Sequence, residues 1–182
     1  MTYRLFAALP LPDAVTERVL PLMDHVPGAK WRPEENLHIT LAFYGDMDGA
    51  TAEELDHELA RIRVAPFDLR LKGASHFGKA EPTSLWLGVE GGEALPDLAR
   101  RCAKAGKAAG VPPERRVYTP HLTLAYLGRD VDIVKLQRFE QSLNLYTSET
   151  WRADRFHLYS SHTRKPGKPN AYEIEAEYPL ER

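Results

Sequence analysis

The sequence HITLAFYG at residues 38–45 returns, without a gap, as HLTLAYLG at residues 121–128. His, Thr, Leu, Ala and Gly recur in place, and the positions that differ stay apolar or aromatic. A single His-x-Thr match arises easily by chance, so the signal lies in the whole duplicated octet. The duplication predicts two copies of one structural unit within the chain.

Each octet has the alternation of a half-buried β-strand. Successive side chains of a strand point to opposite faces. We therefore expect one set of branched and aromatic residues to be buried, namely Ile39, Leu41 and Phe43 in the first octet and Leu122, Leu124 and Tyr126 in the second. The opposite face of each strand should show a His, a Thr two residues on, and a small Ala that leaves room for a ligand.

The residues on that opposite face, His38 with Thr40 and His121 with Thr123, suit attack on a phosphodiester. Imidazole can hold either protonation state near neutral pH, so one neutral ring can take a proton from water while one protonated ring gives a proton to the departing oxygen. A Thr hydroxyl can donate to a phosphate oxygen, where charge accumulates in the transition state. This set requires no metal and no cofactor.

Two other interpretations of the histidines stay open. They could be satisfied polar residues on a semi-exposed sheet face, although the duplicated octet favours a functional role. They could instead bind a divalent metal, since imidazole is a common ligand. Neither octet contains a carboxylate or a Cys that would complete such a site, which makes metal binding the weaker interpretation.

Length and charge limit the class of protein. The chain has 182 residues and a formal net charge of −2. This length suits a single domain, 1–182, in which the duplication would give two similar lobes. A protein that mainly coats long nucleic acid usually needs a clear basic excess, which is absent, but a local basic site could still hold one or two phosphates.

Cys102 is the only cysteine, so no intrachain disulfide is possible and a reducing compartment is favoured. We expect Cys102 to be a small buried residue of a helix. The nearby cations Arg100, Arg101 and Lys104 could instead lower the pKa of its thiol. The first ten residues lack the apolar run of a signal peptide, and no stretch approaches the roughly 20 apolar residues of a membrane span. A cytoplasmic protein without a membrane partner is expected.

Strand and helix patterns alternate along the rest of the chain. Helices are expected over residues 13–26 with a break at Pro21, from a capping box at Thr51 to about residue 62, over 95–110, and from Asp130 to about 143. Further strands are expected over 3–9, 67–77, 83–89, 151–160 and 172–178. Paired strands mixed with helices favour an α+β fold with helices on the outer sheet faces.

The paired motifs resemble those of the 2H phosphoesterase superfamily, and within it the RNA 2′,3′-cyclic phosphodiesterases, also called 2′-5′ RNA ligase-like proteins. The likeness covers nearly the whole chain. Its segments appear in the family's order: RLFAALPLP (4–12), WRPEENLHITLAFYGD (31–46), SLWLGV (84–89), TPHLTLAYLG (119–128) and the closing Tyr178-Pro179-Leu180.

This resemblance implies a bilobal fold with pseudo-two-fold symmetry, in which two antiparallel sheets line a central cleft. It implies hydrolysis of a terminal 2′,3′-cyclic phosphate to a 2′-phosphomonoester. His38 would be the proton donor and His121 the proton acceptor, while Thr40 and Thr123 would hold phosphate oxygens. The division of roles between the two histidines comes from the resemblance and not from the residues themselves.

One position departs from the pattern, because relatives often carry a phosphate-binding Arg where this chain has Tyr126. A phenol can donate one hydrogen bond but cannot form a charged two-pronged contact. Arg129 could substitute, as could the basic loop at residues 161–170. We expect Arg164, Lys165 and Lys168 of that loop to form a basic lip over an RNA strand, the alternative being a solvated turn.

The predicted substrates are RNA ends or small nucleotides that carry a 2′,3′-cyclic phosphate, with no obligate protein partner evident. Two alternatives remain. The chain could be a non-catalytic nucleotide- or RNA-binding module that keeps the cleft without turnover. It could also act on another small nucleotide, such as a cyclic phosphate of ADP-ribose.

Overall fold

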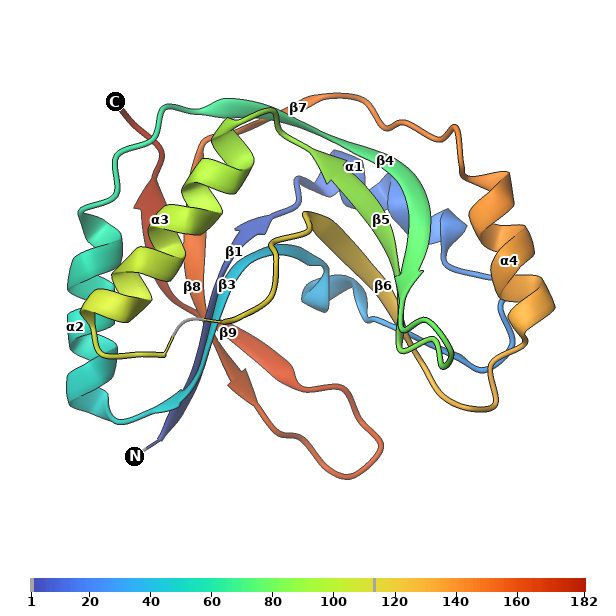
Figure 1. Ribbon diagram of the computed structural model, residues 1–182, viewed down its shortest axis with the longest axis horizontal. Coiled ribbons are helices and arrows are strands. Elements are labelled where there is room, and N and C mark those ends of the chain that lie inside the picture. The colour runs from blue at the N-terminus through green and yellow to red at the C-terminus, as the bar shows by residue number, and fades with distance from the viewer. Residues whose placement is uncertain (1, 113) are drawn as a thin grey trace.

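The computed structural model describes residues 2–112 and 114–182, and in these residues nine strands form one curled sheet (Figure 1). The strand order is β7-β4-β5-β6-β3-β1-β8-β9, and β2 pairs with β6. The strands are β1 (Tyr3–Pro10), β2 (Ala29–Trp31), β3 (His38–Met47), β4 (Phe67–Phe77), β5 (Ser84–Glu90), β6 (His121–Leu127), β7 (Trp151–Ala153), β8 (Arg155–His162) and β9 (Ala171–Pro179). All of the recorded pairings are antiparallel.

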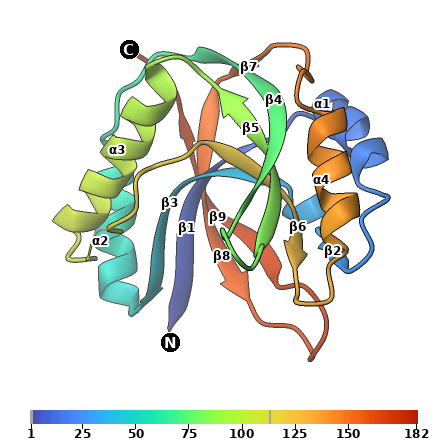
Figure 2. The same ribbon diagram turned by 45° about the vertical axis from the view of Figure 1, so that its right-hand side comes forward.

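The helices lie on the two outer flanks of the curled sheet (Figure 2). They are α1 (Asp13–Val19), α2 (Gly49–Ala60), α3 (Ala94–Ala108) and α4 (Ile133–Ser142), with short 3₁₀ turns η1 (Leu20–Leu22) and η2 (Glu34–Asn36). Helices α2 and α3 cover the flank of β1 and β3, while α1 and α4 cover the opposite flank (Figures 1 and 2). The predicted α+β class with outer helices is confirmed.

The two expected sheets are joined into one. The link between the two halves is a single residue pair, Ile39 of β3 with Leu122 of β6. These residues occupy the same position in the two octets, so each copy of the repeat pairs with the other at its equivalent residue. Because the contact is so short, the strands diverge on either side of it, and the two halves of the sheet curl around a shared hollow.

Local polar groups move two helix starts away from the expected residues. Helix α2 begins after Asp48, whose carboxylate accepts a hydrogen bond from the Thr51 backbone N–H at 2.9 Å, so the expected cap at Thr51 is wrong. Helix α4 begins after Asp132, not Asp130, with the same type of cap. The expected break at Pro21 is confirmed, since α1 ends at Val19 and a 3₁₀ turn follows.

The face of α3 toward the sheet is buried and includes Cys102, which is fully buried as expected. The backbone carbonyl of Cys102 accepts a hydrogen bond from the hydroxyl of Tyr44 at 3.0 Å, and this bond joins α3 to β3. Burial raises the pKa of the Cys102 thiol, so the thiolate that would make it reactive is disfavoured. None of the described helices is both long and apolar enough to cross a membrane.

Candidate active site

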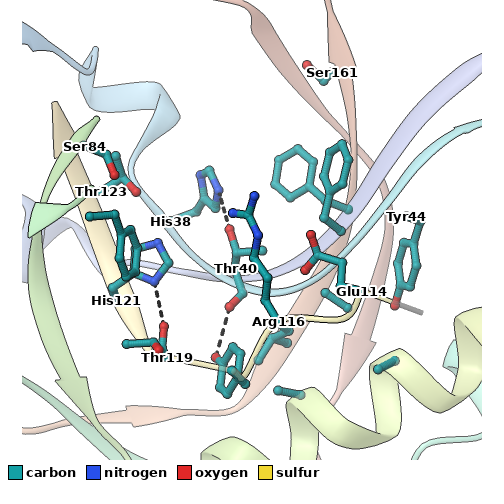
Figure 3. Close-up of a pocket in the computed structure, with 18 of the residues that line it drawn as sticks. His38, Thr40, Tyr44, Ser84, Glu114, Arg116, Thr119, His121, Thr123 and Ser161 are labelled. Atoms are coloured by element: carbon teal, nitrogen blue, oxygen red, sulfur yellow. Dashed lines mark hydrogen bonds between the residues drawn. The ribbon is translucent and has the colours of Figure 1, made fainter. Parts of the chain in front are cut away.

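The curled sheet encloses one large cleft of about 790 Å³, and all four residues of the duplicated His-Thr pairs line it (Figure 3). His38 and Thr40 come from β3, and His121 and Thr123 from β6. The antiparallel Ile39–Leu122 pair brings the two copies together from opposite directions. These four residues therefore line the same cleft, and their role as one site stays a prediction.

Both histidines are held by the same type of hydrogen bond, from Nδ1 to the carbonyl of the residue two positions before. His38 Nδ1 lies 2.8 Å from the Asn36 carbonyl oxygen, and His121 Nδ1 lies 2.7 Å from the Thr119 carbonyl oxygen. A carbonyl can only accept, so Nδ1 carries the proton and donates in each ring. In the neutral form, Nε2 is then the free base. For His38 this atom lies 3.1 Å from the Thr40 hydroxyl, which donates to it.

The protonation of the two rings depends on their burial. Burial lowers the pKa of His38 to about 4, an effect that the hydrogen bond to Asn36 opposes and the positive charge of Arg32 strengthens. Burial also lowers the pKa of His121, and the hydrogen bond to Thr119 partly offsets this effect. Burial therefore favours the neutral form of both rings near neutral pH. An anion bound between them would favour the imidazolium form that an acid requires.

Aromatic rings surround both histidines. The His38 ring centroid lies 4.9 Å from Phe6 and 5.4 Å from Tyr172, and the His121 centroid lies 4.9 Å from Phe77. These contacts restrict the orientation of each imidazole and remove water from its faces. They account for the burial that lowers both pKa values.

A β-bulge at the same position of each octet reverses the expected alternation. The extra residue is Leu41 on β3 and its equivalent, Leu124, on β6. Beyond a bulge the side chains change face, so the expected burial of Phe43 and Tyr126 is wrong. Their exposed fractions are 43% and 48%, and both line the cleft. Tyr44 takes the buried position instead.

The other predicted binding residues divide into two groups. Tyr126 lines the cleft. Arg129 is exposed outside the cleft lining, with its Nε 3.7 Å from a carboxylate oxygen of Glu81. Arg164, Lys165 and Lys168 lie exposed in the loop between β8 and β9 and do not line the cleft. That hairpin contributes Ser161, Asn170 and Tyr172 to the cleft instead.

Two arginines that the sequence analysis did not select, Arg32 and Arg116, also line the cleft. Of the four arginines in the lining, Arg4 pairs with Asp46 and Arg100 with Asp97. Among the residues that the structure describes, no carboxylate pairs with Arg32 or Arg116. Both lie within a few residues of a His-x-Thr motif, which is the one signal that could have drawn attention to them.

Asn36 was also missed, although it supports His38 in two ways. Its carbonyl accepts from the His38 ring, and its side-chain amide donates to the Asn170 carbonyl at 2.8 Å. This hydrogen bond joins the turn η2 to the β8–β9 hairpin. The sequence analysis did not select this residue, because its partner Asn170 lies far along the chain.

A possible metal-binding group exists elsewhere on the molecule. His162, Glu173 and Glu175 lie close together on the exposed β8–β9 hairpin, outside the cleft lining. In the described part of the chain, no similar group includes His38 or His121. The described part of the cleft lining contains one carboxylate, Glu114, beside two imidazoles, hydroxyls and four arginines, a set that favours an anion over a cation.

Comparison with known proteins identifies the family. The model of the 2′-5′ RNA ligase superfamily matches residues 11–165. The chain belongs to this superfamily. A protein of Thermotoga maritima named RNA 2′,3′-cyclic phosphodiesterase is 31% identical over 165 residues, which cover 87% of this chain and 86% of the relative. The resemblance found in the sequence motifs is thus confirmed.

Other similar proteins show how far the similarity extends. A relative of the same name from Geobacillus stearothermophilus is 37% identical over 103 residues, which span 55% of this chain but only 33% of that protein. The crystal structure of apo LigT from Escherichia coli gives a TM-score of 0.81 at 24% identity, covering 100% of this chain and 99% of that chain. TT0787 of Thermus thermophilus gives 0.77 at 25% identity, with 97% of each chain covered. These structures share the fold.

Proposed function

We propose that this protein is a metal-independent RNA 2′,3′-cyclic phosphodiesterase that forms 2′-phosphomonoester ends. The observation that carries the proposal is the pair of histidines, each with Nδ1 bonded to a backbone carbonyl, whose Nε2 atoms are left for chemistry in one cleft. Support also comes from the relatives named RNA 2′,3′-cyclic phosphodiesterase.

In the proposed reaction, Nε2 of His121 takes a proton from a water molecule, and the water oxygen bonds to phosphorus. The bond from phosphorus to the 3′ oxygen breaks, and Nε2 of His38 gives that oxygen a proton. Thr40 and Thr123 donate hydrogen bonds to the phosphate oxygens, where negative charge increases. The cycle ends when His121 loses its proton to solvent and His38 regains one.

The negative charge of the substrate also changes the protonation of His38 in this scheme. Without ligand, His38 is neutral and accepts a hydrogen bond from Thr40. A bound phosphate raises the pKa of His38, because the negative charge offsets the burial of the imidazolium. Once His38 is protonated, Nε2 becomes a donor, and the Thr40 hydroxyl is released to bind the phosphate.

The finer features of the fold belong to the same proposal. The equivalent pair Ile39–Leu122 and the equivalent bulges at Leu41 and Leu124 support a local two-fold relation between two interleaved lobes of one domain, 1–182. Such a relation would present one His-Thr pair on each side of the phosphate, which suits in-line displacement. A cytoplasmic location stays a prediction from the sequence.

The deciding experiment incubates the protein with a 2′,3′-cyclic mononucleotide in EDTA. A 2′-monophosphate product supports the proposal, including its metal independence. Saturable binding without product would instead indicate a nucleotide-binding module. Turnover of an ADP-ribose cyclic phosphate at a higher kcat/KM than a 2′,3′-cyclic mononucleotide would move the assignment to that substrate class. Product that appears only after a divalent metal is restored would refute the His/His mechanism.

A further inference from the structure

Arg32 is close enough to His38 to act on its charge, and neutral groups hold it in place. It follows β2, and its backbone N–H donates to the Leu124 carbonyl at 2.8 Å. Its guanidinium carbon lies 4.7 Å from the centre of the Tyr126 ring, and Nη2 donates to the Tyr172 hydroxyl at 3.3 Å. A planar guanidinium held on one ring and bonded to another loses little freedom when it binds a ligand.

The charge of Arg32 has no partner in the described part of the chain. The side chain is half-buried, and its neighbours Tyr126 and Tyr172 are phenols. A guanidinium that is withdrawn from water normally has a carboxylate or another anion beside it. The other unpaired arginine of the lining, Arg116, is exposed on the loop before β6 and has no such support. Arg32 is therefore a preformed site for an anion.

We propose that Arg32 binds the reactive phosphate of the substrate, with Tyr126 and Tyr172 as positioning residues; the identity of this phosphate rests on the proposed function. The diester substrate carries one negative charge and the monoester product carries two. A guanidinium can donate two parallel N–H bonds to phosphate oxygens, which a phenol cannot. The Tyr126 side chain thus supports a cation that comes from the segment after β2.

The groups around His38 show what this binding changes. His38 faces Arg32, His121 of β6, Tyr159 of β8 and Tyr172 of β9. Burial raises the pKa of Tyr159 to about 12 and also raises the pKa of Tyr172, so both phenols stay neutral. Arg32 and His121 are then the charged or titrating groups that act on His38. A phosphate on Arg32 offsets the guanidinium charge and favours a proton on His38.

The kinetic test compares Arg32→Gln with Lys30→Gln. Lys30 is an exposed cation of β2 that does not line the cleft, so its loss matches the charge change without touching the site. For a 2′,3′-cyclic mononucleotide, we expect kcat/KM to fall about 10- to 100-fold in Arg32→Gln and less than two-fold in Lys30→Gln. Arg32→Lys should recover only part of the loss. Equal rates in Arg32→Gln and wild type would overturn the proposal.

A second test needs no turnover. We expect added inorganic phosphate to raise the pH at which the His38 ring titrates in NMR spectra of the wild type, and to have at least ten-fold weaker affinity for Arg32→Gln. Tyr172→Phe, which keeps the ring but removes the bonded hydroxyl, should weaken phosphate binding less than the loss of Arg32 does. If Arg32→Gln binds phosphate as tightly as wild type, the proposal is refuted even in an active enzyme.

These two experiments separate the two proposals. A wild-type protein that hydrolyses no cyclic phosphate, yet binds phosphate through Arg32, would refute the proposed function and retain the anion site. An active enzyme whose phosphate affinity is insensitive to Arg32 would do the reverse. A thermal unfolding midpoint close to that of wild type confirms that each variant is folded.

Discussion

At the scale of single residues, the site depends on which nitrogen of each imidazole is free. The carbonyls of Asn36 and Thr119 take the Nδ1 protons, so Nε2 is left for chemistry in both His38 and His121. The two rings share this arrangement because each His lies two residues after the carbonyl that it contacts. Their difference lies in burial and in the charge of Arg32, which acts on His38.

In the proposed mechanism, removal of either imidazole removes one of the two proton transfers. We expect His38→Ala and His121→Ala each to lower kcat for a 2′,3′-cyclic mononucleotide by about 100- to 10,000-fold. His25→Ala is the control, since His25 is exposed and lies outside the cleft lining. Steady-state kinetics with circular dichroism of each variant provides the measurement. Near-wild-type turnover in either cleft variant would rule out the paired scheme.

The pH dependence of kcat/KM follows from the lowered pKa values of both histidines. The proposed reaction needs one neutral and one protonated ring, so kcat/KM should be bell-shaped. Its maximum should lie on the acid side of pH 6.5, because burial lowers the pKa of His38 to about 4 and also lowers that of His121. The maximum of kcat should lie at higher pH, because bound phosphate favours the imidazolium. A flat profile between pH 5 and 8 would contradict this.

At the scale of elements, the packing of α3 against β3 fixes one wall of the cleft. Gly106 lies on the buried face of α3, where a glycine weakens helix propensity by about 1 kcal/mol relative to Ala. A Cβ at this position would lie 2.8 Å from Cε1 of Tyr44 and 2.9 Å from its Cδ1. The glycine therefore makes room for the ring that joins the helix to the strand through the carbonyl of Cys102.

Gly106→Ala should lower stability despite the better helix propensity. The displaced Tyr44 ring would cost about 1–3 kcal/mol, which equals or exceeds the gain of at most about 1 kcal/mol in helix propensity from Ala. Gly49→Ala at the start of α2 is the matched control, because its Cβ would meet nothing within 4 Å. Urea unfolding gives the two free energies. A Gly106→Ala protein more stable than wild type would show that the Tyr44 ring shifts without cost.

At the scale of the whole molecule, the cleft is made from distant segments, and it buries a titratable group. Residues 32–44, the α3 flank, residues 114–123 and the β8–β9 hairpin all contribute to its lining. Their closure around His38 withdraws the imidazole from water and favours its neutral form in the folded state. The fold therefore couples stability to the protonation state of His38.

The folded protein should lose stability in acid through His38. Its pKa is lowered from 6.5 to about 4 on folding, so the unfolded chain binds the proton first as the pH falls. The contribution of His38 to the free energy of unfolding is complete above pH 6.5 and decreases between pH 6.5 and 4. The total loss amounts to about 3 kcal/mol. Urea unfolding of wild type and His38→Gln at several pH values measures the difference. An identical pH dependence in both proteins would contradict this coupling.

The sequence alone predicted the family, the α+β class and the strand character of both octets. It also predicted that the four residues of the His-Thr pairs lie in one cleft. These features follow from local patterns, since alternation, residue type and spacing lie within a few positions of each other. The buried state of Cys102 and the helix break at Pro21 were predicted for the same reason.

Only the tertiary structure decided the faces of Phe43 and Tyr126, the union of the strands into one sheet and the presence of Arg32 in the site. A bulge is an extra residue in one strand relative to the strand that pairs with it. That partner strand lies far away in the sequence. Arg32 likewise gains its role from Tyr126 and Tyr172, which the chain places beside it only after folding.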